Sequence, residues 1–402
     1  MTATLFATVE RAPRDPILGL TEAFSADSRA DKVNLGVGVY YDDKGKLPLL
    51  KCIKEAEASR IAAAPPRGYQ PIEGALLYNQ AVQSLLFGAN SKVLTDQRVV
   101  TIEALGGTGA LKVGADYLRR LLPQAKVAIS DPSWENHRAI FEMAGFEVVN
   151  YRYYDPVTRG VDFDGLMASL KGLPRGTILV LHACCHNPTG VDLTLDQWGR
   201  VITAIEAAGH VAFLDMAYQG FGEGTAPDAA VLEAFVASGL SFLVSSSFSK
   251  SFSLYGERVG ALCIVTQSAD ESSRVLSQIK RTIRTNYSNP PTHGGAVVAM
   301  VLSTPALKDL WETELAEMRN RIKLMRRGLA DGLKARGYKG DVGFITSQRG
   351  MFSYTGLSTQ QVDRLREGYG VYAVGTGRIC IAALNEHNLA HVCEAISAVA
   401  AE

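Results

Sequence analysis

One lysine lies where the sequence could present a reactive amine. Lys250 ends the segment Ser245-Ser-Ser-Phe-Ser-Lys250, which follows the apolar run Phe242–Val244. A lysine amine forms a Schiff base with a carbonyl once desolvation or a nearby cation lowers its pKa. The serines, together with Arg258 further along the chain, can donate hydrogen bonds to a phosphate. Taken alone, however, the segment is more typical of a surface lysine in a serine-rich loop.

An aspartate ends a second apolar run. Asp215 follows Val211–Leu214, and it must face a polar group because an unpaired buried carboxylate is costly. A pyridinium nitrogen is a suitable partner, since the carboxylate keeps it protonated and protonation makes the ring an electron sink. Tyr218 can donate to a hydroxyl oxygen on such a ring. The alternative is that Asp215 caps the following helix, which is common where a strand leads into a helix.

A glycine-rich turn, Leu105-Gly-Gly-Thr-Gly-Ala110, leads into the helical pattern Leu111–Leu122. Backbone N–H groups and the helix dipole would hold a phosphate there. A dinucleotide is less suitable, because Lys112 stands where the third glycine of the dinucleotide fingerprint would be. The turn therefore indicates a site for a single phosphate.

The segment His182-Ala-Cys-Cys-His186-Asn-Pro-Thr-Gly190 combines two cysteines and two histidines. It has no second Cys or His pair at ligand spacing, so it is a weak zinc signal, and we expect no metal. Its second half predicts a tight turn after the strand Thr177–Leu181, with Asn187 directed into the crevice at the strand ends.

Two arginines are candidates for binding a substrate carboxylate. Arg378 precedes the apolar run Ile379–Ile381, and Arg284 lies in Arg281-Thr-Ile-Arg284. A guanidinium group binds a carboxylate with two parallel hydrogen bonds. Most arginines are solvated surface residues, so neither would be selected in isolation.

The elements that must position these residues alternate between strand-like and helical patterns from about residue 95 to residue 265. The predicted strands are Val127–Ser130, Thr177–Leu181, Val211–Leu214, Phe242–Val244 and Ala261–Val265. Strands that are apolar on both faces and separated by helices predict a mainly parallel sheet in an α/β domain. Such sheets bind ligands beyond the carboxyl ends of their strands.

The last hundred residues have a different pattern. A long amphipathic helix is predicted over Trp311–Leu329, followed by short strand-like pieces, a polar helix around Gln360–Glu367 and a final helix that ends near Ala400. We interpret this part as a smaller α+β domain packed on the first.

The composition narrows the classes of function. In 402 residues, 41 basic side chains balance 41 acidic ones, so the surface lacks the excess of positive charge that nucleic acids and anionic membranes require. Six cysteines in so long a chain do not form a disulfide framework. With neither a signal-peptide pattern nor an apolar run of membrane-spanning length, we expect a cytoplasmic protein that acts on small molecules.

Taken together, these segments resemble the class I aminotransferases, which use pyridoxal 5′-phosphate, and specifically the aspartate and aromatic-amino-acid subgroup. The similarity runs from Asp15 to the final helix, and the motifs around Gly107, Asn187, Asp215, Lys250 and Arg378 occur in the family's order. It implies PLP fold type I: a large domain (48–316) with a mainly parallel, seven-stranded type of sheet, a small α+β domain (15–47 and 317–402) and an N-terminal arm (1–14).

The resemblance also implies roles at the cofactor. Lys250 forms a Schiff base with the cofactor and, once freed by the substrate, moves a proton between the substrate's Cα and the cofactor's C4′. Asp215 holds the ring nitrogen with His137 behind it, and Tyr218 and Asn187 hold the ring hydroxyl. Trp134 stacks on the ring. The phosphate ligands implied are Gly107, Thr108, Ser247, Arg258 and, from the neighbouring subunit, Tyr69. Gly106 departs from the family, in which many members carry a serine there.

For the substrate, the resemblance implies that Arg378 binds the α-carboxylate and that Arg284 meets a distal carboxylate from across a dimer interface. Gly38 matches the loop of the small domain that closes over the substrate, and Trp134 and Asn187 also border it. If Tyr69 and Arg284 act across the interface, a homodimer is obligatory for catalysis.

The amino donor is predicted from two features. Arg284 favours aspartate and glutamate, whereas the segments around Gly107, Trp134, Tyr255 and Phe352 resemble the bacterial aromatic (tyrosine) branch, which accepts both classes. We therefore predict an aromatic-amino-acid aminotransferase that transfers the amino group of tyrosine, phenylalanine and aspartate to 2-oxoglutarate by a ping-pong mechanism. An aspartate aminotransferase with little aromatic activity is the alternative, and a PLP-dependent lyase or decarboxylase is a more remote one.

Overall fold

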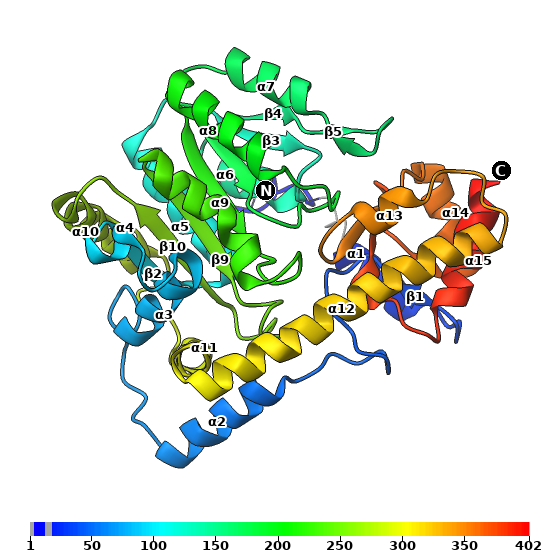
Figure 1. The fold of residues 1–402 in the computed structure, drawn as a ribbon, viewed down its shortest axis with the longest axis horizontal. Helices are drawn as coiled ribbons and strands as arrows, with labels where there is room; N and C mark the ends of the chain where they lie inside the picture. Colours follow the sequence, from blue (N-terminus) through cyan, green and yellow to red (C-terminus); the bar gives the residue numbers. More distant parts are fainter. Residues whose placement is uncertain (1–3, 13–17, 402) are drawn as a thin grey trace.

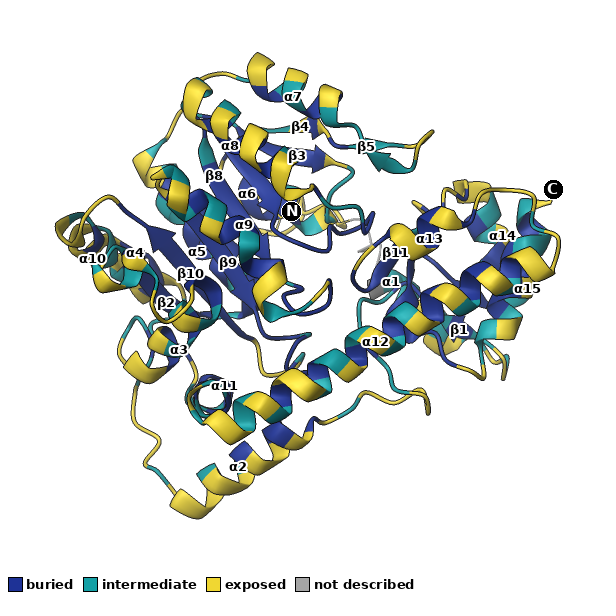
Figure 2. Cartoon of the chain, in the orientation of Figure 1, coloured by how far each residue is buried: buried dark blue, intermediate teal, exposed yellow. Residues whose placement is uncertain are grey.

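Seven strands form the central sheet in a computed structural model that describes residues 4–12 and 18–401. In spatial order they are β2 (Val99–Leu105), β10 (Val259–Val265), β9 (Phe242–Ser247), β8 (Val211–Met216), β7 (Ile178–His182), β3 (Val127–Asp131) and β4 (Val148–Arg152). Only β10 runs antiparallel to its neighbours within this sheet. The predicted mainly parallel sheet is confirmed, and β7, β9 and β10 are buried along their whole length (Figure 2).

Helices cover both faces of this sheet, and each face has its own apolar core (Figure 1). On one face lie α5 (Gly106–Leu121), α6 (Glu135–Met143) and α10 (Ala269–Asn286). On the other lie α3 (Leu76–Phe87), α7 (Phe163–Gly172), α8 (Leu195–Ala208), α9 (Thr225–Ser238) and α11 (Thr292–Ser303). This layering explains why the central strands are apolar on both sides, and it leaves the strand ends as the place where polar side chains can gather.

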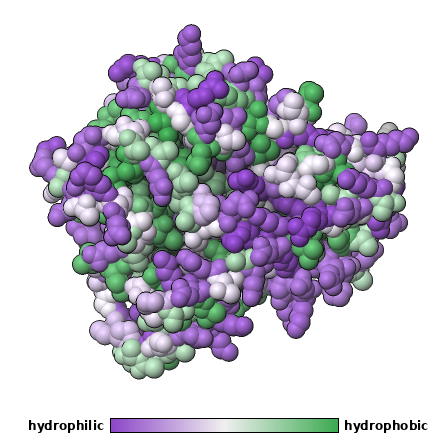
Figure 3. Space-filling model, in the orientation of Figure 1, coloured by the Kyte–Doolittle hydropathy of each residue, from purple (hydrophilic) through white to green (hydrophobic). Residues whose placement is uncertain are grey.

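A second lobe is built from both ends of the chain around the long helix α12 (Pro305–Ala335), which runs from one lobe to the other (Figure 1). The lobe holds α1 (Leu18–Ala26), α13 (Gly343–Ser347), α14 (Thr359–Tyr369) and α15 (Leu389–Ala400). Its small sheets pair β1 (Val33–Asn34) with β12 (Val371–Tyr372) and β11 (Phe352–Tyr354) with β13 (Arg378–Cys380), and the short helix η1 (Ile381–Ala383) follows β13. Hydrophilic residues gather over α12 where it passes between the lobes (Figure 3).

The remaining elements are short or peripheral. They are α2 (Lys51–Ala63), α4 (Lys92–Thr95) and the hairpin of β5 (Tyr154–Asp155) with β6 (Gly160–Val161). Within residues 4–12 and 18–401, no helix has both the length and the apolar character needed to cross a membrane. All six cysteines are free and buried, in agreement with the expected lack of a disulfide framework.

Two strands of the sheet were missed by the sequence patterns, and one helix begins earlier than predicted. Strand β2 is interrupted as an apolar run by Glu103, and edge strand β4 is only partly buried. Helix α5 begins at Gly106 rather than at Leu111, because the glycine turn already has helical hydrogen bonding. Of the predicted N-terminal arm, residues 4–12 are exposed, whereas residues 1–3, 13 and 14 lie outside the described residues, as does Asp15.

Candidate active site

A cavity of about 400 Å³ lies at the carboxyl ends of the parallel strands, where five loops of the large lobe meet the small lobe. It is lined by Val37, Gly38, Gly107, Thr108, Leu111, Trp134, His182, Asn187, Asp215, Ala217, Tyr218, Ser247, Ser249, Lys250, Tyr255, Arg258, Phe352 and Arg378. The structure therefore brings together residues from all five sequence motifs. A larger cavity of about 880 Å³, beside α8, α9 and α13, is lined by no lysine and by none of these motif residues except Cys184 and its neighbour Ala183.

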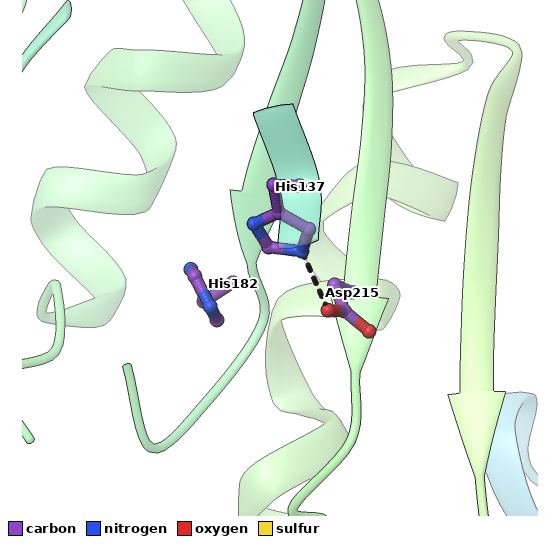
Figure 4. A group of neighbouring side chains, drawn as sticks. All are labelled: His137, His182 and Asp215. Carbon is purple, nitrogen blue, oxygen red and sulfur yellow. Dashed lines mark hydrogen bonds and ion pairs between the residues drawn. The ribbon is translucent and has the colours of Figure 1, made fainter. Parts of the chain in front are cut away.

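Asp215 lies inside β8 and does not cap a helix, so the alternative reading of this residue is wrong. His137 Nε2 donates to Asp215 Oδ2 over 2.8 Å, and Ser245 Oγ donates to Asp215 Oδ1 over 2.7 Å. Burial alone would raise the pKa of Asp215, but the contacts with His137, His182 and Ser245 outweigh burial and hold it below its usual value. The result is a buried carboxylate that faces the cavity, with His137 behind it (Figure 4).

The ring of His182 lies beside that of His137, with 4.8 Å between their centroids (Figure 4). Burial lowers the pKa of His182 to about 3, so this side chain is neutral. His137 Nδ1 lies 3.0 Å from Ser133 Oγ, so both ring nitrogens of His137 have a hydrogen-bond partner. This chain of contacts orients His137 and, through it, Asp215.

Lys250 occupies the turn after β9, with its Nζ 4.9 Å from the ring centroid of Tyr218. Burial lowers the pKa of Lys250 from 10.5 to about 8; Asp215 opposes the shift, and Arg258 and Arg378 add to it. Near neutral pH more of this amine is therefore unprotonated than in an ordinary lysine, and the unprotonated amine is the form that acts as a nucleophile or proton acceptor.

One end of the cavity is suited to a phosphate. Helix α5 begins with the glycine turn, so its first backbone N–H groups are directed to this end. A Cβ on Gly107 would lie 3.0 Å from Ser247 Cβ, and a Cβ on Gly106, whose φ is +68°, would lie 2.5 Å from Arg258 Nη2. A side chain at Gly107 would crowd Ser247, whereas one at Gly106 would meet only the flexible end of Arg258.

Arg378 reaches the opposite side of the cavity from the small lobe. Its Nη1 donates to Asn187 Oδ1 over 3.1 Å, and its Nη2 donates to the carbonyl of Gly36 over 2.7 Å. The side chain is 1% exposed, its Nε has no partner, and among the described residues no carboxylate forms an ion pair with it. A buried guanidinium without a counter-charge is costly, so the cavity is complementary to an anion at this point.

Tyr69 and Arg284 are not part of the cavity within one chain. The Tyr69 side chain is 97% exposed, and Arg284, in the last turn of α10, is exposed and donates to Ser288 Oγ. Their predicted action on the site of a neighbouring subunit stays a prediction.

Sequence reasoning missed several residues that line the cavity, among them His182, Tyr255 and Phe352. The ring of Phe352 lies 4.4 Å from the guanidinium carbon of Arg378, and the hydroxyl of Tyr255 accepts a hydrogen bond from Tyr40 N over 2.9 Å. His182 stood in the cysteine–histidine segment but had been considered only as a metal ligand. Phe352 and Tyr255 lie in segments that resemble the aromatic branch of the family. A single aromatic residue is more often part of a hydrophobic core, so neither was assigned to the site.

Among the described residues, two groups of side chains lie close enough to share a cation. One is His137, His182 and Asp215; the other is Cys184, Cys185 and Asp228, and within each group the ligand atoms lie within 4.8 Å of one another. In the first group, His182 and Asp215 line the cavity and His137 is hydrogen-bonded to Asp215. In the second, Asp228 already accepts hydrogen bonds from the backbone of Gly220, Gly222 and Glu223, so its carboxylate has a structural task.

The fold and this cavity define an aminotransferase: residues 30–396 match the family described as aminotransferase class I and II, and the chain belongs to it. The sequence is 63% identical to the aspartate aminotransferase of Pseudomonas aeruginosa over 393 residues, which cover 98% of this chain and 99% of that protein. It is 52% identical to the aromatic-amino-acid aminotransferase of Escherichia coli, covering 98% of this chain and all (100%) of that protein.

Solved structures agree with this assignment. The crystal structure of the aromatic-amino-acid aminotransferase from Burkholderia pseudomallei, covalently bound to pyridoxal phosphate, superposes with a TM-score of 0.97 at 63% identity. The match covers 98% of this chain and 99% of that one. Relatives of equal identity thus carry different substrate names, so similarity by itself does not select the amino donor.

Proposed function

We propose that this chain transfers the amino group of tyrosine, phenylalanine and aspartate to 2-oxoglutarate by a ping-pong mechanism, with pyridoxal 5′-phosphate bound at the strand ends. One observation carries the proposal: Lys250, an amine with a lowered pKa, and Arg378, a buried guanidinium without an acidic partner, line the same cavity. Transamination of an amino acid needs both groups: an amine to move the proton at its Cα and a guanidinium to bind its α-carboxylate.

The residues present fit pyridoxal phosphate. Asp215 would hold the ring nitrogen, with His137 as its positioning residue, and the hydroxyl of Tyr218 and the amide of Asn187, 3.3 Å apart, would hold the ring hydroxyl. Gly107, Thr108, Ser247 and Arg258 would bind the phosphate. Trp134, whose ring packs edge-to-face on His137, would cover the ring. When bound, the cofactor supplies an electron-accepting ring that stabilises negative charge at the substrate's Cα.

The chain's own residues then perform the proton transfer. Lys250 Nζ removes the proton from the substrate's Cα and delivers it to the neighbouring carbon on the cofactor side, so the same amine acts first as base and then as acid. Asp215 keeps the ring nitrogen protonated during this transfer. Tyr218 stays a neutral phenol because burial raises its pKa, so its hydroxyl donates a hydrogen bond to the ring oxygen.

Substrate binding would use both lobes. Arg378 would bind the α-carboxylate. The carbonyl of Gly36, which accepts a hydrogen bond from this arginine, belongs to the loop that contains Gly38. A Cβ on Gly38 would lie 2.8 Å from Phe352 Cζ, so only glycine lets this loop lie against that ring. We assign residues 15–47 and 317–402 to a small domain that closes over the substrate, 48–316 to the large domain and 1–14 to an arm.

Aromatic donors in addition to aspartate are supported by the relatives of that name and by the apolar border of the cavity, Val37, Leu111 and Phe352. The test compares kcat/KM for tyrosine, phenylalanine and aspartate, each with 2-oxoglutarate. We expect turnover with all three. Negligible turnover of both aromatic donors beside rapid turnover of aspartate would reduce the proposal to an aspartate aminotransferase.

A homodimer with shared active sites forms part of the proposal. Tyr69 is almost fully exposed, and the apolar side chains of Ile61, Leu76 and Leu77 on the neighbouring helices α2 and α3 are each more than half exposed. Exposed apolar groups on this scale are typical of a contact with another chain. A cytoplasmic location is also proposed, supported by six cysteines that are free and buried.

A further inference from the structure

Glu103 is a buried acid that the proposed chemistry does not use. It lies on β2, the edge strand that leads directly into the phosphate turn, and it is 2% exposed. Its Oε2 is buried without a hydrogen-bond partner. An unsatisfied carboxyl oxygen in the interior normally costs stability, so its presence calls for a compensating role.

Two glycines make room for this side chain. A Cβ on Gly74 would lie 2.5 Å from Glu103 Cβ, and a Cβ on Gly295, in the first turn of α11, would lie 2.0 Å from Glu103 Oε1. Gly74 also has a φ of +90°, which any other residue adopts only under strain. The backbones of two different segments therefore lie so close to the Glu103 side chain that neither position has room for a side chain of its own.

The first of these segments carries Tyr69. Glu103 N donates to the carbonyl of Glu73 over 2.9 Å, and the backbone of Gly74 lies against the Glu103 side chain. The segment that contains Tyr69 thus ends in a stretch held by both the main chain and the side chain of Glu103.

The second segment follows Arg284. The hydroxyl of Tyr287, which closes α10, donates to the carbonyl of Glu103 over 3.1 Å. Asn289 Nδ2 then donates to the carbonyl of Gln70 over 3.2 Å and so connects the two segments directly. An ion pair of 2.6 Å between Lys280, in the middle of α10, and Glu73 also connects these two segments.

We propose that Glu103 is a positioning residue for the shared active site: its side chain sets the spacing between the segment that carries Tyr69 and the start of α11, and thereby aims Tyr69 and Arg284 at the partner subunit. This inference rests on the proposed dimeric function. Burial raises the pKa of Glu103 to about 7, so near neutral pH far more of this side chain is the neutral acid than for an ordinary glutamate. The charge of Glu103 helps to raise the pKa of two phenols, Tyr78 on α3 and Tyr287. The thiol of Cys263 on β10 packs on the same face of the sheet.

The experiment uses the holoenzyme and three variants. Glu103→Ala removes the filling group, Glu103→Gln keeps its shape, and Thr101→Val is the matched control, since Thr101 lies on the same face of β2, is equally buried and is hydrogen-bonded to Gln83. For each protein, KM and kcat are measured for aspartate and for phenylalanine as donors, and the retention of pyridoxal phosphate after gel filtration is read from the absorption spectrum.

In Glu103→Ala we expect KM for aspartate to rise about tenfold, which corresponds to roughly 1.4 kcal/mol. KM for phenylalanine should change less than about twofold, because only the dicarboxylic donor needs Arg284. Cofactor retention falls as Tyr69 loses its place. Glu103→Gln and Thr101→Val should match the wild type in the ratio of the two KM values. If Glu103→Ala does not accumulate as a folded dimer, Glu103→Asp, one methylene shorter, should shift the ratio in the same direction.

An unchanged ratio in Glu103→Ala, or an equal change in Thr101→Val, would overturn the inference and leave the proposed function intact. A wild-type protein that does not transaminate aspartate at all would instead overturn the proposed function. The two failures are therefore distinguishable in one set of measurements.

Discussion

Arg378 and Asn187 are hydrogen-bonded across the junction of the two lobes, with 3.1 Å between Nη1 of the arginine and Oδ1 of the amide. Arg378 starts β13 of the small lobe, and Asn187 follows β7 of the central sheet. The amide nitrogen of Asn187 also donates to the hydroxyl of Tyr218 over 3.3 Å. The proposed carboxylate-binding arginine is thereby linked to the two side chains proposed to hold the ring hydroxyl of the cofactor.

Replacement of Lys250 by alanine should remove nearly all transamination. General acid–base catalysis by one positioned side chain contributes up to roughly 10⁴-fold, and this amine also serves as the proposed covalent anchor of the cofactor. The measurements are kcat/KM and, on borohydride-treated protein, the mass of the chain. The exposed Lys171→Ala variant of α7 is the control. Turnover of the Lys250→Ala protein near the wild-type rate would refute the assignment.

Arg378→Lys keeps the positive charge but loses the two parallel hydrogen bonds that a guanidinium offers a carboxylate. Hydrogen bonds to charged groups contribute about 1.5–3 kcal/mol, so kcat/KM should fall roughly 10- to 150-fold for every amino donor. Arg274→Lys, at an exposed position of α10, should leave the rate unchanged. A loss confined to aspartate would show that Arg378 binds a distal carboxylate instead.

Shared active sites can be tested with hybrid dimers. Lys250→Ala and Arg284→Ala chains are each expected to be inactive toward aspartate, but a mixed dimer contains one intact site if Arg284 acts in the partner. Random exchange of a symmetric dimer should then restore about a quarter of the wild-type activity. No recovery after exchange, verified by mass spectrometry of the mixed species, would place Arg284 in the site of its own chain.

Glu103 should make stability depend on pH. Its pKa is raised from 4.5 to about 7, so the native chain binds this proton more tightly than the unfolded chain does. The contribution of Glu103 to the free energy of unfolding is therefore fully present below the ordinary pKa of 4.5. It is lost as the pH rises through the native pKa of about 7. At about 1.4 kcal/mol for each pH unit, the loss approaches roughly 3 kcal/mol.

Glu103→Gln should lack this loss, so its melting temperature relative to the wild type should rise between about pH 5 and pH 8, measured at fixed concentrations of protein and cofactor. The exposed Glu206→Gln variant of α8 serves as the control and should follow the wild type. Parallel pH profiles of Glu103→Gln and the wild type would mean that Glu103 titrates normally.

Much of the site could be predicted from the sequence because its residues occupy fixed places relative to strands. Lys250 and Asn187 follow apolar runs that become β9 and β7, and Asp215 ends the run that becomes β8. The carboxyl ends of adjacent parallel strands meet at one edge, so their convergence follows from local pattern alone. Strand β2 was missed for the opposite reason, since Glu103 in its middle is tolerated only through contacts with Gly74 and Gly295.

The sequence by itself determined the parallel sheet, the aminotransferase family and most of the residues that line the candidate cavity, since these depend on periodicity and on short motifs. Only the tertiary structure decided that Arg378 is buried without a counter-charge, that Phe352 and Tyr255 line the cavity, and that Glu103 lies between Gly74 and Gly295. Burial and spacing between distant segments set the pKa of a lysine, the need for a counter-ion and the fit of a side chain. Those quantities depend on packing in three dimensions, which residue type and spacing along the chain do not specify.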